Sequence, residues 1–447
     1  MPKTTFEQVP LNPAHRWLLS YFQPPFEWFD SLSFTITSRI SIKRVEKTIQ
    51  ALVKRHSALR TEFVHGKSGW QQKICNECAK ELLKPIIVPG EGLSAEQLEK
   101  LIEGIKLAIC KSFRIDQLPL FRFVIVEMGR HNYTFHVFFH HIIVDYLSIV
   151  IFIKEFYHLY FNENAALSSP VSNSVYSQEI QELEKVISVG SLDKYIVKED
   201  LAWLGIHNQT SRPSAEMNGV RFKEAISHES SEVLLRSAKT HFNKSGLHAV
   251  LAAPLYRAIK KITDQTLVCV SHKLLGREIK PNDIRFFSSI GNFAVNTPVS
   301  CEVFPNETWN LLIDRLEASL NEDQTRNLIY DLAGPRLPAG CYPDQLIAPV
   351  RFYFMGSMSF QTPKFLQIDF HKFAQRVTVP EQILTTFVEF FVYFSERQLF
   401  IEVVADRLLI SETIHRDLTN NYIEEVNNVV KAIKKDGLLC QSHQSQF

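Results

Sequence analysis

The middle of the chain reads Tyr133-Thr134-Phe135-His136-Val137-Phe138-Phe139, followed directly by His140-His141-Ile142-Ile143-Val144-Asp145. The first run is aromatic and β-branched, which is typical of a buried strand. Leu147–Tyr160 is rich in Ile and Phe and is expected to form a helix. The chain therefore turns from strand to helix at two imidazoles and a carboxylate. Because apolar residues flank these polar groups, the groups need hydrogen-bond partners or a function.

Helices and strands are expected on both sides of this turn. Ser41 predicts the cap of a helix that ends near His56, and Leu59–Val64 then leads through the turn Gly66–Gly69 into a hairpin. In the second half, apolar spacing predicts two helices, one strand, a hairpin and a last helix, over Ser231–His241, His248–Ile262, Leu267–Ser271, Phe387–Val404 and after Ser411. The fold class is therefore mixed α/β (α+β).

A short polar stretch offers the best boundary between two parts of the chain. Asn162–Ser174 contains Pro170 and four serines, a composition typical of a linker. We therefore expect an N-terminal lobe over residues 1–168, which contains the two histidines, and a C-terminal lobe over residues 169–447.

Composition excludes several classes of protein. With 447 residues, 45% of them hydrophobic, the chain can form a packed core. Lys and Arg total 49 against 48 Asp and Glu, a balance that argues against a nucleic-acid binder. Met1–Pro13 lacks the pattern of a signal peptide, and the apolar window Phe135–Ile153 contains ionisable groups that are costly in lipid. We expect a cytoplasmic protein with reduced thiols and no membrane partner.

His140, His141 and Asp145 are the strongest candidates for chemistry. A histidine at a strand end can accept a proton near neutral pH, and a carboxylate past the turn can fix the loop by pairing with a cation or by capping the next helix. The alternative is that both histidines are hydrogen-bonded core residues and that Asp145 is only a helix cap. The residues by themselves leave these two interpretations open.

The sequence gives little support to a metal site or to a serine nucleophile. His136 and His140 could share one face of the strand, but they match no common metal-ligand pattern, so we expect no metal. Cys75-Asn76-Glu77-Cys78 has the spacing of half a zinc site, and no second pair follows at a suitable distance. No Gly-x-Ser-x-Gly sequence occurs that would indicate a serine nucleophile.

At these residues the chain resembles a known family. His140-His141-x-x-x-Asp145 is similar to the His-His-x-x-x-Asp-Gly motif of nonribosomal peptide synthetase condensation domains, in the chloramphenicol-acetyltransferase-like superfamily. Agreement in order and spacing extends from about residue 12 to residue 297, through Asn12–Leu18, Arg55–Phe63, Gly276-Arg277 and Ile290–Thr297.

The resemblance implies two acetyltransferase-like lobes in a V-shaped pseudo-dimer, with the active site in the tunnel between them. His141 would be the catalytic histidine, acting as general base or positioning the attacking amine. His140 would be structural, and Arg60 would pair with Asp145. The alternative for Arg60 is a helix-end cation that faces solvent.

The resemblance also implies residues near the substrate. Tyr146 stands where the family has glycine, so the acceptor side of the tunnel is expected to be narrowed or altered. With Tyr146, the residues Ser148, Gly291 and Asn296 are expected to line the tunnel or contact substrate.

The expected activity is that of a free-standing, monomeric condensation enzyme, because the sequence has no carrier, adenylation or thioesterase signature. The acyl or aminoacyl donor would arrive as a thioester on the phosphopantetheine of a carrier protein, or on coenzyme A, and no cofactor would be bound. The acceptor would be an amine, giving an amide. An ester-forming or coenzyme-A-dependent acyltransferase and a non-catalytic module that recruits a partner are the two alternatives.

Overall fold

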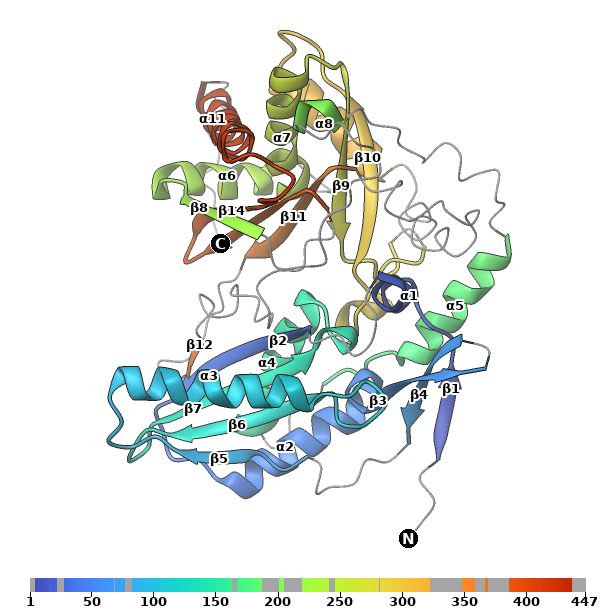
Figure 1. Ribbon diagram of the computed structural model, residues 1–447, viewed down its shortest axis with the longest axis vertical. Helices are drawn as coiled ribbons and strands as arrows, with labels where there is room; N and C mark the ends of the chain where they lie inside the picture. Colours follow the sequence, from blue (N-terminus) through green and yellow to red (C-terminus); the bar gives the residue numbers. More distant parts are fainter. Residues whose placement is uncertain are drawn as a thin grey trace, which may run out of the picture. The chain divides into compact units, whose positions relative to one another are not determined.

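Two compact units make up the computed structural model (Figure 1). The structure describes residues 5–21, 28–67, 69–76, 83–162, 167–186, 201–204, 219–240, 246–280, 282–321, 348–357, 366–368 and 386–435. The first unit comprises Met1–Ile187, Leu275–Val295 and Gln361–Glu381, and the second comprises Ser188–Leu274, Asn296–Phe360 and Gln382–Phe447.

These units differ from the ranges 1–168 and 169–447 predicted from the linker. The first unit continues through helix α5 (Asn173–Val186) and also takes in Leu275–Val295, here called the return segment. The physical reason is the set of polar contacts between this segment and the turn at His140–Asp145, described below.

The first unit is built on a five-stranded sheet. Its order is β12 (Leu366–Ile368), β2 (Phe29–Ile36), β7 (Tyr133–His140), β6 (Phe121–Glu127) and β5 (Ile86–Pro89). Helix α3 (Ala95–Ser112) crosses one face, where Ile109 and Phe138 share a buried cluster (Figure 1). Helix α4 (Tyr146–Phe161) packs on the other face, where Phe156 meets Phe34 and Phe135.

The remaining elements of the first unit confirm the expected local structure. Ser41 caps α2 (Ile42–Arg55), its side chain accepting from the Arg44 amide. After η1 (Ser57–Arg60), β3 and β4 form the predicted hairpin, and β1 completes a three-stranded sheet in the order β1 (Phe6–Val9), β4 (Gly69–Cys75), β3 (Thr61–Gly66). Helix α1 spans Pro13–Tyr21.

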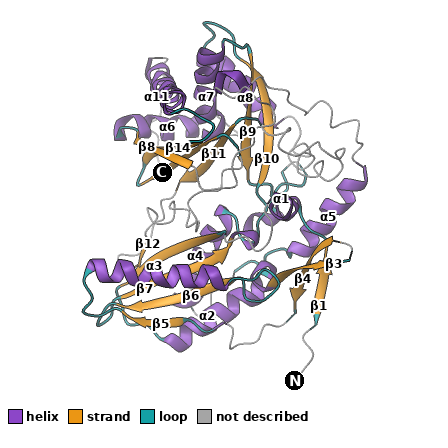
Figure 2. Cartoon of the chain, in the orientation of Figure 1, coloured by secondary structure: helices purple, strands orange, loops and turns teal. Residues whose placement is uncertain are grey.

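The second unit carries a six-stranded sheet, visible with its helices in Figure 2. Its order is β10 (Val295–Glu302), β9 (Leu267–Leu274), β11 (Val350–Ser357), β13 (Val388–Ser395), β14 (Gln398–Asp406) and β8 (Gly219–Ala225). Its helices within the described residues are η6 (Leu201–Leu204), α6 (His228–Thr240), α7 (Leu247–Thr263), α8 (Trp309–Asn321) and α11 (Glu412–Lys435).

One face of this second sheet forms the core with α7 and α11. Tyr422 of α11 packs against Phe352 and Phe390 of the sheet and donates its hydroxyl to the Leu251 carbonyl of α7 at 2.9 Å. The predicted hairpin β13–β14 is confirmed, and Ser411 caps α11 as expected. Among the helices that the structure describes, none is long and apolar enough to cross a membrane.

Candidate active site

The predicted turn joins β7 to α4 over His140–Asp145, here called the histidine loop. One 3-10 turn, η3 (His141–Ile143), follows the strand, and His140 caps it because the Ile142 N–H donates to His140 Nδ1 at 3.2 Å. Asp145 caps α4 by accepting from the Ser148 amide at 2.8 Å. His140 and Asp145 are buried, so both side chains hold the loop rather than face solvent.

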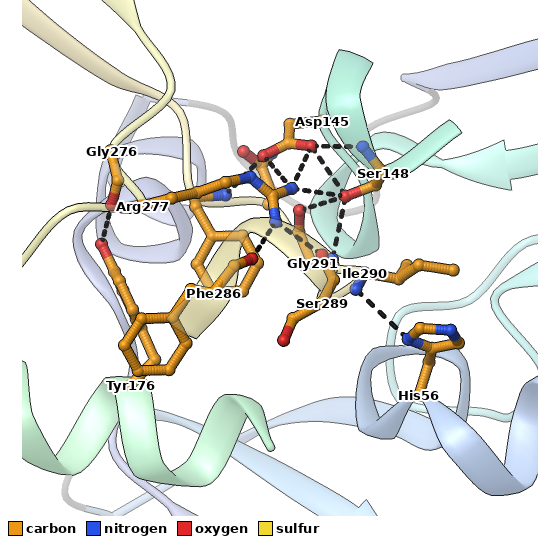
Figure 3. Close-up of polar contacts among 12 residues, drawn as sticks. His56, Asp145, Ser148, Tyr176, Gly276, Arg277, Phe286, Ser289, Ile290 and Gly291 are labelled. Carbon is orange, nitrogen blue, oxygen red and sulfur yellow. Dashed lines mark hydrogen bonds and ion pairs between the residues drawn. The ribbon is translucent and has the colours of Figure 1, made fainter. Parts of the chain in front are cut away.

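Asp145 forms a buried ion pair with Arg277, a residue of the return segment (Figure 3). One guanidinium nitrogen, Nη2, donates to both carboxylate oxygens, at 2.7 and 2.8 Å. The other, Nη1, donates to the carbonyls of Phe286 and Ser289, at 2.7 and 2.5 Å. The Arg277 side chain is 0% exposed and that of Asp145 is 4% exposed, so each charge depends on the other.

The predicted pairing of Arg60 with Asp145 is therefore wrong. Arg60 ends η1, and its guanidinium donates instead to the backbone carbonyl of Cys75, the last residue of β4. The carboxylate does need a cation, as expected, but the chain supplies that cation from 132 residues further along.

Ser148 links the histidine loop to the return segment, and its expected contact with substrate stays a prediction. Its hydroxyl lies 2.7 Å from both Asp145 Oδ1 and the Gly291 carbonyl, and it accepts from the Gly291 amide at 2.9 Å (Figure 3). Ser148 is 0% exposed, and Gly291 is buried too. A Cβ on Gly291 would meet Asn173 and the ring of Phe293 at 2.6 Å, so Gly291 serves close packing.

Gly276 explains why a Gly-Arg pair stands in the return segment. Its φ is +60°, and a Cβ there would meet the Phe293 carbonyl oxygen at 1.9 Å. The Gly276 carbonyl accepts from Tyr176 of α5 at 2.6 Å, and the Phe293 ring lies under the Arg277 guanidinium at 4.5 Å. The glycine therefore lets the backbone pass close enough to direct Arg277 toward Asp145.

A second set of hydrogen bonds connects the return segment to α2 and α4. His56 Nδ1 accepts from the Ile290 amide at 3.3 Å, and His56 Nε2 lies 2.8 Å from Glu155 of α4. Arg55 also donates to Glu155. Burial raises the pKa of Glu155, but the hydrogen bonds from His56 and Arg55 outweigh it, so the net pKa lies below the usual range.

His141 is the residue that these contacts position. Its amide donates to the Trp28 carbonyl at 2.8 Å, and its own carbonyl accepts from Asn292 of the return segment at 2.9 Å. The Trp28 ring stacks on the imidazole, with ring centres 4.1 Å apart and planes at 10°. Nδ1 lies 2.6 Å from Asp30 Oδ2. With its side chain 12% exposed, His141 is the least buried of the loop's two histidines and Asp145.

The other predicted site residues have different settings. Tyr146 begins α4, and burial raises the pKa of its phenol. Asn296 is a buried residue of β10 in the second unit. Expected contacts of Tyr146 and Asn296 with substrate stay predictions. Cys75 is buried, and Cys78 lies outside the described residues. No group of three metal-ligating side chains occurs in the described part of the chain.

Sequence reasoning missed Asp30 and the role of Arg277. Asp30 is the first of the residues that lie on one face of β2. The later residues on that face, Leu32, Phe34 and Ile36, are buried and apolar. A carboxylate on such a face is a signal that could have been read. The Gly276-Arg277 pair is visible in the sequence, but nothing in the sequence indicates that its segment folds back onto the first unit.

A comparison with protein families covers the part of the chain that contains these residues. The family model described as "Condensation domain" matches residues 6–330, a range that includes the histidine loop and the return segment. The chain belongs to the condensation domain family. This condensation domain is 28% identical over 249 residues to surfactin synthase subunit 1 of Bacillus subtilis, and 26% identical over 300 residues to bacitracin synthase 2 of Bacillus licheniformis. Those matches cover 54% and 65% of the chain, but only 6% and 11% of the curated relatives.

Solved structures show the same fold over nearly the whole condensation domain. The epimerization domain from the third module of tyrocidine synthetase B has a TM-score of 0.74 at 16% identity, covering 97% of this chain and 98% of that one. The condensation domain from Monacolin K polyketide synthase has a TM-score of 0.72 at 13% identity, covering 96% and 98%. The predicted fold class is confirmed.

Proposed function

We propose that this condensation domain transfers an acyl or aminoacyl group from the phosphopantetheine thioester of a carrier protein to an amine, forming an amide. The observation that carries the proposal is the arrangement of the histidine loop. His140 and Asp145 are buried and hold the loop, whereas His141 keeps a partly exposed imidazole. Family membership supports the same assignment, because the match includes this loop.

The proposed reaction needs no covalent intermediate on the protein. The amine nitrogen attacks the thioester carbonyl carbon, the new C–N bond forms, and the C–S bond breaks as the carrier thiolate leaves. The proton from the amine passes to the His141 imidazole and then to the departing thiolate. The cysteines that the structure describes, Cys75, Cys110, Cys269 and Cys301, are all buried, which fits direct attack. Rate acceleration then comes from positioning and proton transfer.

The acceptor is where this chain is expected to differ from its family. Tyr146 replaces the glycine that follows the family motif, and its phenol is largely buried at the start of α4. A side chain at this position takes up space that glycine leaves open. We therefore expect small amines to give product more readily than bulky ones.

A loaded-carrier assay tests the proposal. A carrier protein charged with a panel of acyl and aminoacyl groups is incubated with amine or alcohol acceptors, and products are identified by mass spectrometry. His141→Ala should lower amide formation by at least about 100-fold, the lower range for loss of a general base. His65→Ala, at an exposed histidine of β3, serves as the matched control and should retain activity.

Four outcomes would overturn the assignment. Equal turnover by His141→Ala would remove its catalytic residue. Ester products, or equal use of coenzyme A thioesters, would favour the other acyltransferase class. Inversion at the α-carbon of the carrier-bound residue without amide formation would indicate epimerization, the activity named for one structural relative. Tight carrier binding with no product from any acceptor would favour a recruiting module.

A further inference from the structure

The carboxylate of Asp30 contacts the imidazole of His141 across the sheet. Strands β2 and β7 pair antiparallel with Phe29 opposite His140 and Asp30 opposite Phe139. This register sets Asp30 beside the residue that follows β7, and its Oδ2 lies 2.6 Å from His141 Nδ1. The two side chains are 19% and 12% exposed, so the pair is only partly shielded from water.

Trp28 and the backbone fix the plane of the same ring. The indole stacks on the imidazole at 4.1 Å, and the His141 amide donates to the Trp28 carbonyl. Asn292 holds the His141 carbonyl from the return segment. Stacking fixes the plane of the ring but not the edge that faces Asp30, because a half-turn about Cβ–Cγ keeps the same plane. The contact between Asp30 and Nδ1 selects that edge.

Simple hydrogen-bond chemistry decides which ring nitrogen is basic. An ionised carboxylate only accepts, so beside an ionised Asp30 the proton of this contact lies on His141 Nδ1, which donates the hydrogen bond. In the neutral ring the lone pair then lies on Nε2. When Nε2 takes up a proton, the imidazolium gains a negative partner at hydrogen-bond distance, which favours the protonated form.

We propose that Asp30 is a positioning residue that holds His141 in the tautomer with a basic Nε2 and stabilises the imidazolium formed when that atom accepts a proton. Its role in amide formation rests on the proposed function. The assignment of the tautomer does not, because it concerns the resting protein.

Of the other described groups named around the loop, the charged ones are paired and the rest carry no charge. Asp145 is bound to Arg277, and the Asn292 and Trp28 contacts are neutral. His15 of α1, a helix that contacts η3, stays neutral because burial lowers its pKa to about 3. Two of the described side chains, Asp30 and Trp28, contact the His141 ring in the interactions given above. Of these two, Asp30 is the one that can carry a negative charge.

The resting tautomer can be read directly in the native protein. Protein labelled with ¹⁵N in the histidine rings gives distinct chemical shifts for protonated and unprotonated ring nitrogens, and His141→Gln identifies the His141 signals by their loss. We expect protonated Nδ1 and unprotonated Nε2 above the ring's titration. Protonated Nε2 with unprotonated Nδ1 would overturn the proposal, and this arm needs no substitution at Asp30.

The chemical reactivity of the His141 ring provides a second test of the proposal. Diethyl pyrocarbonate acylates neutral imidazole nitrogens, and fragment mass spectrometry follows His141 as a function of pH, with exposed His65 as the internal reference. Asp30→Asn keeps the size of the side chain and removes its charge. The midpoint of the His141 profile should fall by about one pH unit, the lower range for a charged partner, because the pair is partly exposed. Asp30→Glu should restore most of the shift.

The matched control is Asp116→Asn, a carboxylate-to-amide change at an exposed site of the first unit, which should leave the His141 profile unchanged. An unchanged profile in Asp30→Asn that melts like the native protein would also overturn the proposal. If both ring experiments succeed while the carrier assay gives no product, the proposed function fails and the assignment of Asp30 stands.

Discussion

Replacing Arg277 with methionine removes the cation that neutralises Asp145 inside the first unit. The carboxylate, 4% exposed, keeps its bonds from Ser148 and the Phe293 amide but loses its counter-ion. Leaving one member of a buried pair costs about 3 to 5 kcal/mol. Arg60→Met removes one bond to a backbone carbonyl at a partly buried site, which costs about 0.5 to 1.5 kcal/mol. The two arginine variants should therefore differ by about 1.5 kcal/mol or more in unfolding free energy.

Hydrogen exchange of α4 amides in a urea series measures the unfolding free energy of the first unit separately from the second. A double-mutant cycle adds Asp145→Asn to each arginine variant. Coupling with Arg277 should exceed about 1.5 kcal/mol, whereas coupling between Asp145 and Arg60 should stay within about 0.5 kcal/mol. The pairing described here is wrong if Arg60 couples to Asp145 and Arg277 does not.

Two further perturbations test the packing around the loop. Gly276→Ala should lower the unfolding free energy by more than about 2 kcal/mol. The left-handed backbone strains any side chain, and the new Cβ would lie 1.9 Å from the Phe293 carbonyl oxygen. A urea midpoint equal to the native one would contradict this prediction. Acid should destabilise the fold through His15, whose pKa is lowered by burial to about 3, because the unfolded chain binds its proton below pH 6.5 and the folded chain does not. Between pH 6.5 and 4.5 the native protein should lose roughly 2 to 3 kcal/mol of unfolding free energy through His15. His15→Gln should lose correspondingly less in urea titrations at those two pH values. An identical loss in the variant would show that His15 is not the cause.

Local features of the fold could be predicted from the sequence, and long-range pairing could not. Ser41 and Asp145 cap helices as expected because a cap depends on residues three positions away. The partner of Asp145 depends on where a distant segment returns, and both Arg60 and Arg277 had suitable chemistry. Only the contacts of the folded chain distinguish them.

In the candidate site, too, local features could be predicted from the sequence and long-range contacts could not. His140, His141 and Asp145 were singled out from their place between a strand and a helix, a pattern contained in one stretch of sequence, and the resemblance to condensation domains implied that His141 is the catalytic one. Asp30 was not identified, because its contact with His141 depends on the register of two strands separated by more than a hundred residues along the chain. A sequence shows that a strand can alternate; it does not show which residue lies opposite.

The return segment gives the first unit an order of assembly during translation. Ribosomes extend a chain at about 5 to 20 residues per second, so Asp145 is made roughly 7 to 26 s before Arg277, 132 positions later. Throughout that interval the nascent lobe has a carboxylate with no counter-ion to bury it against. We therefore expect the start of α4 to stay hydrated in the emerging chain, and the lobe to close around its histidines after the distant arginine has left the ribosome.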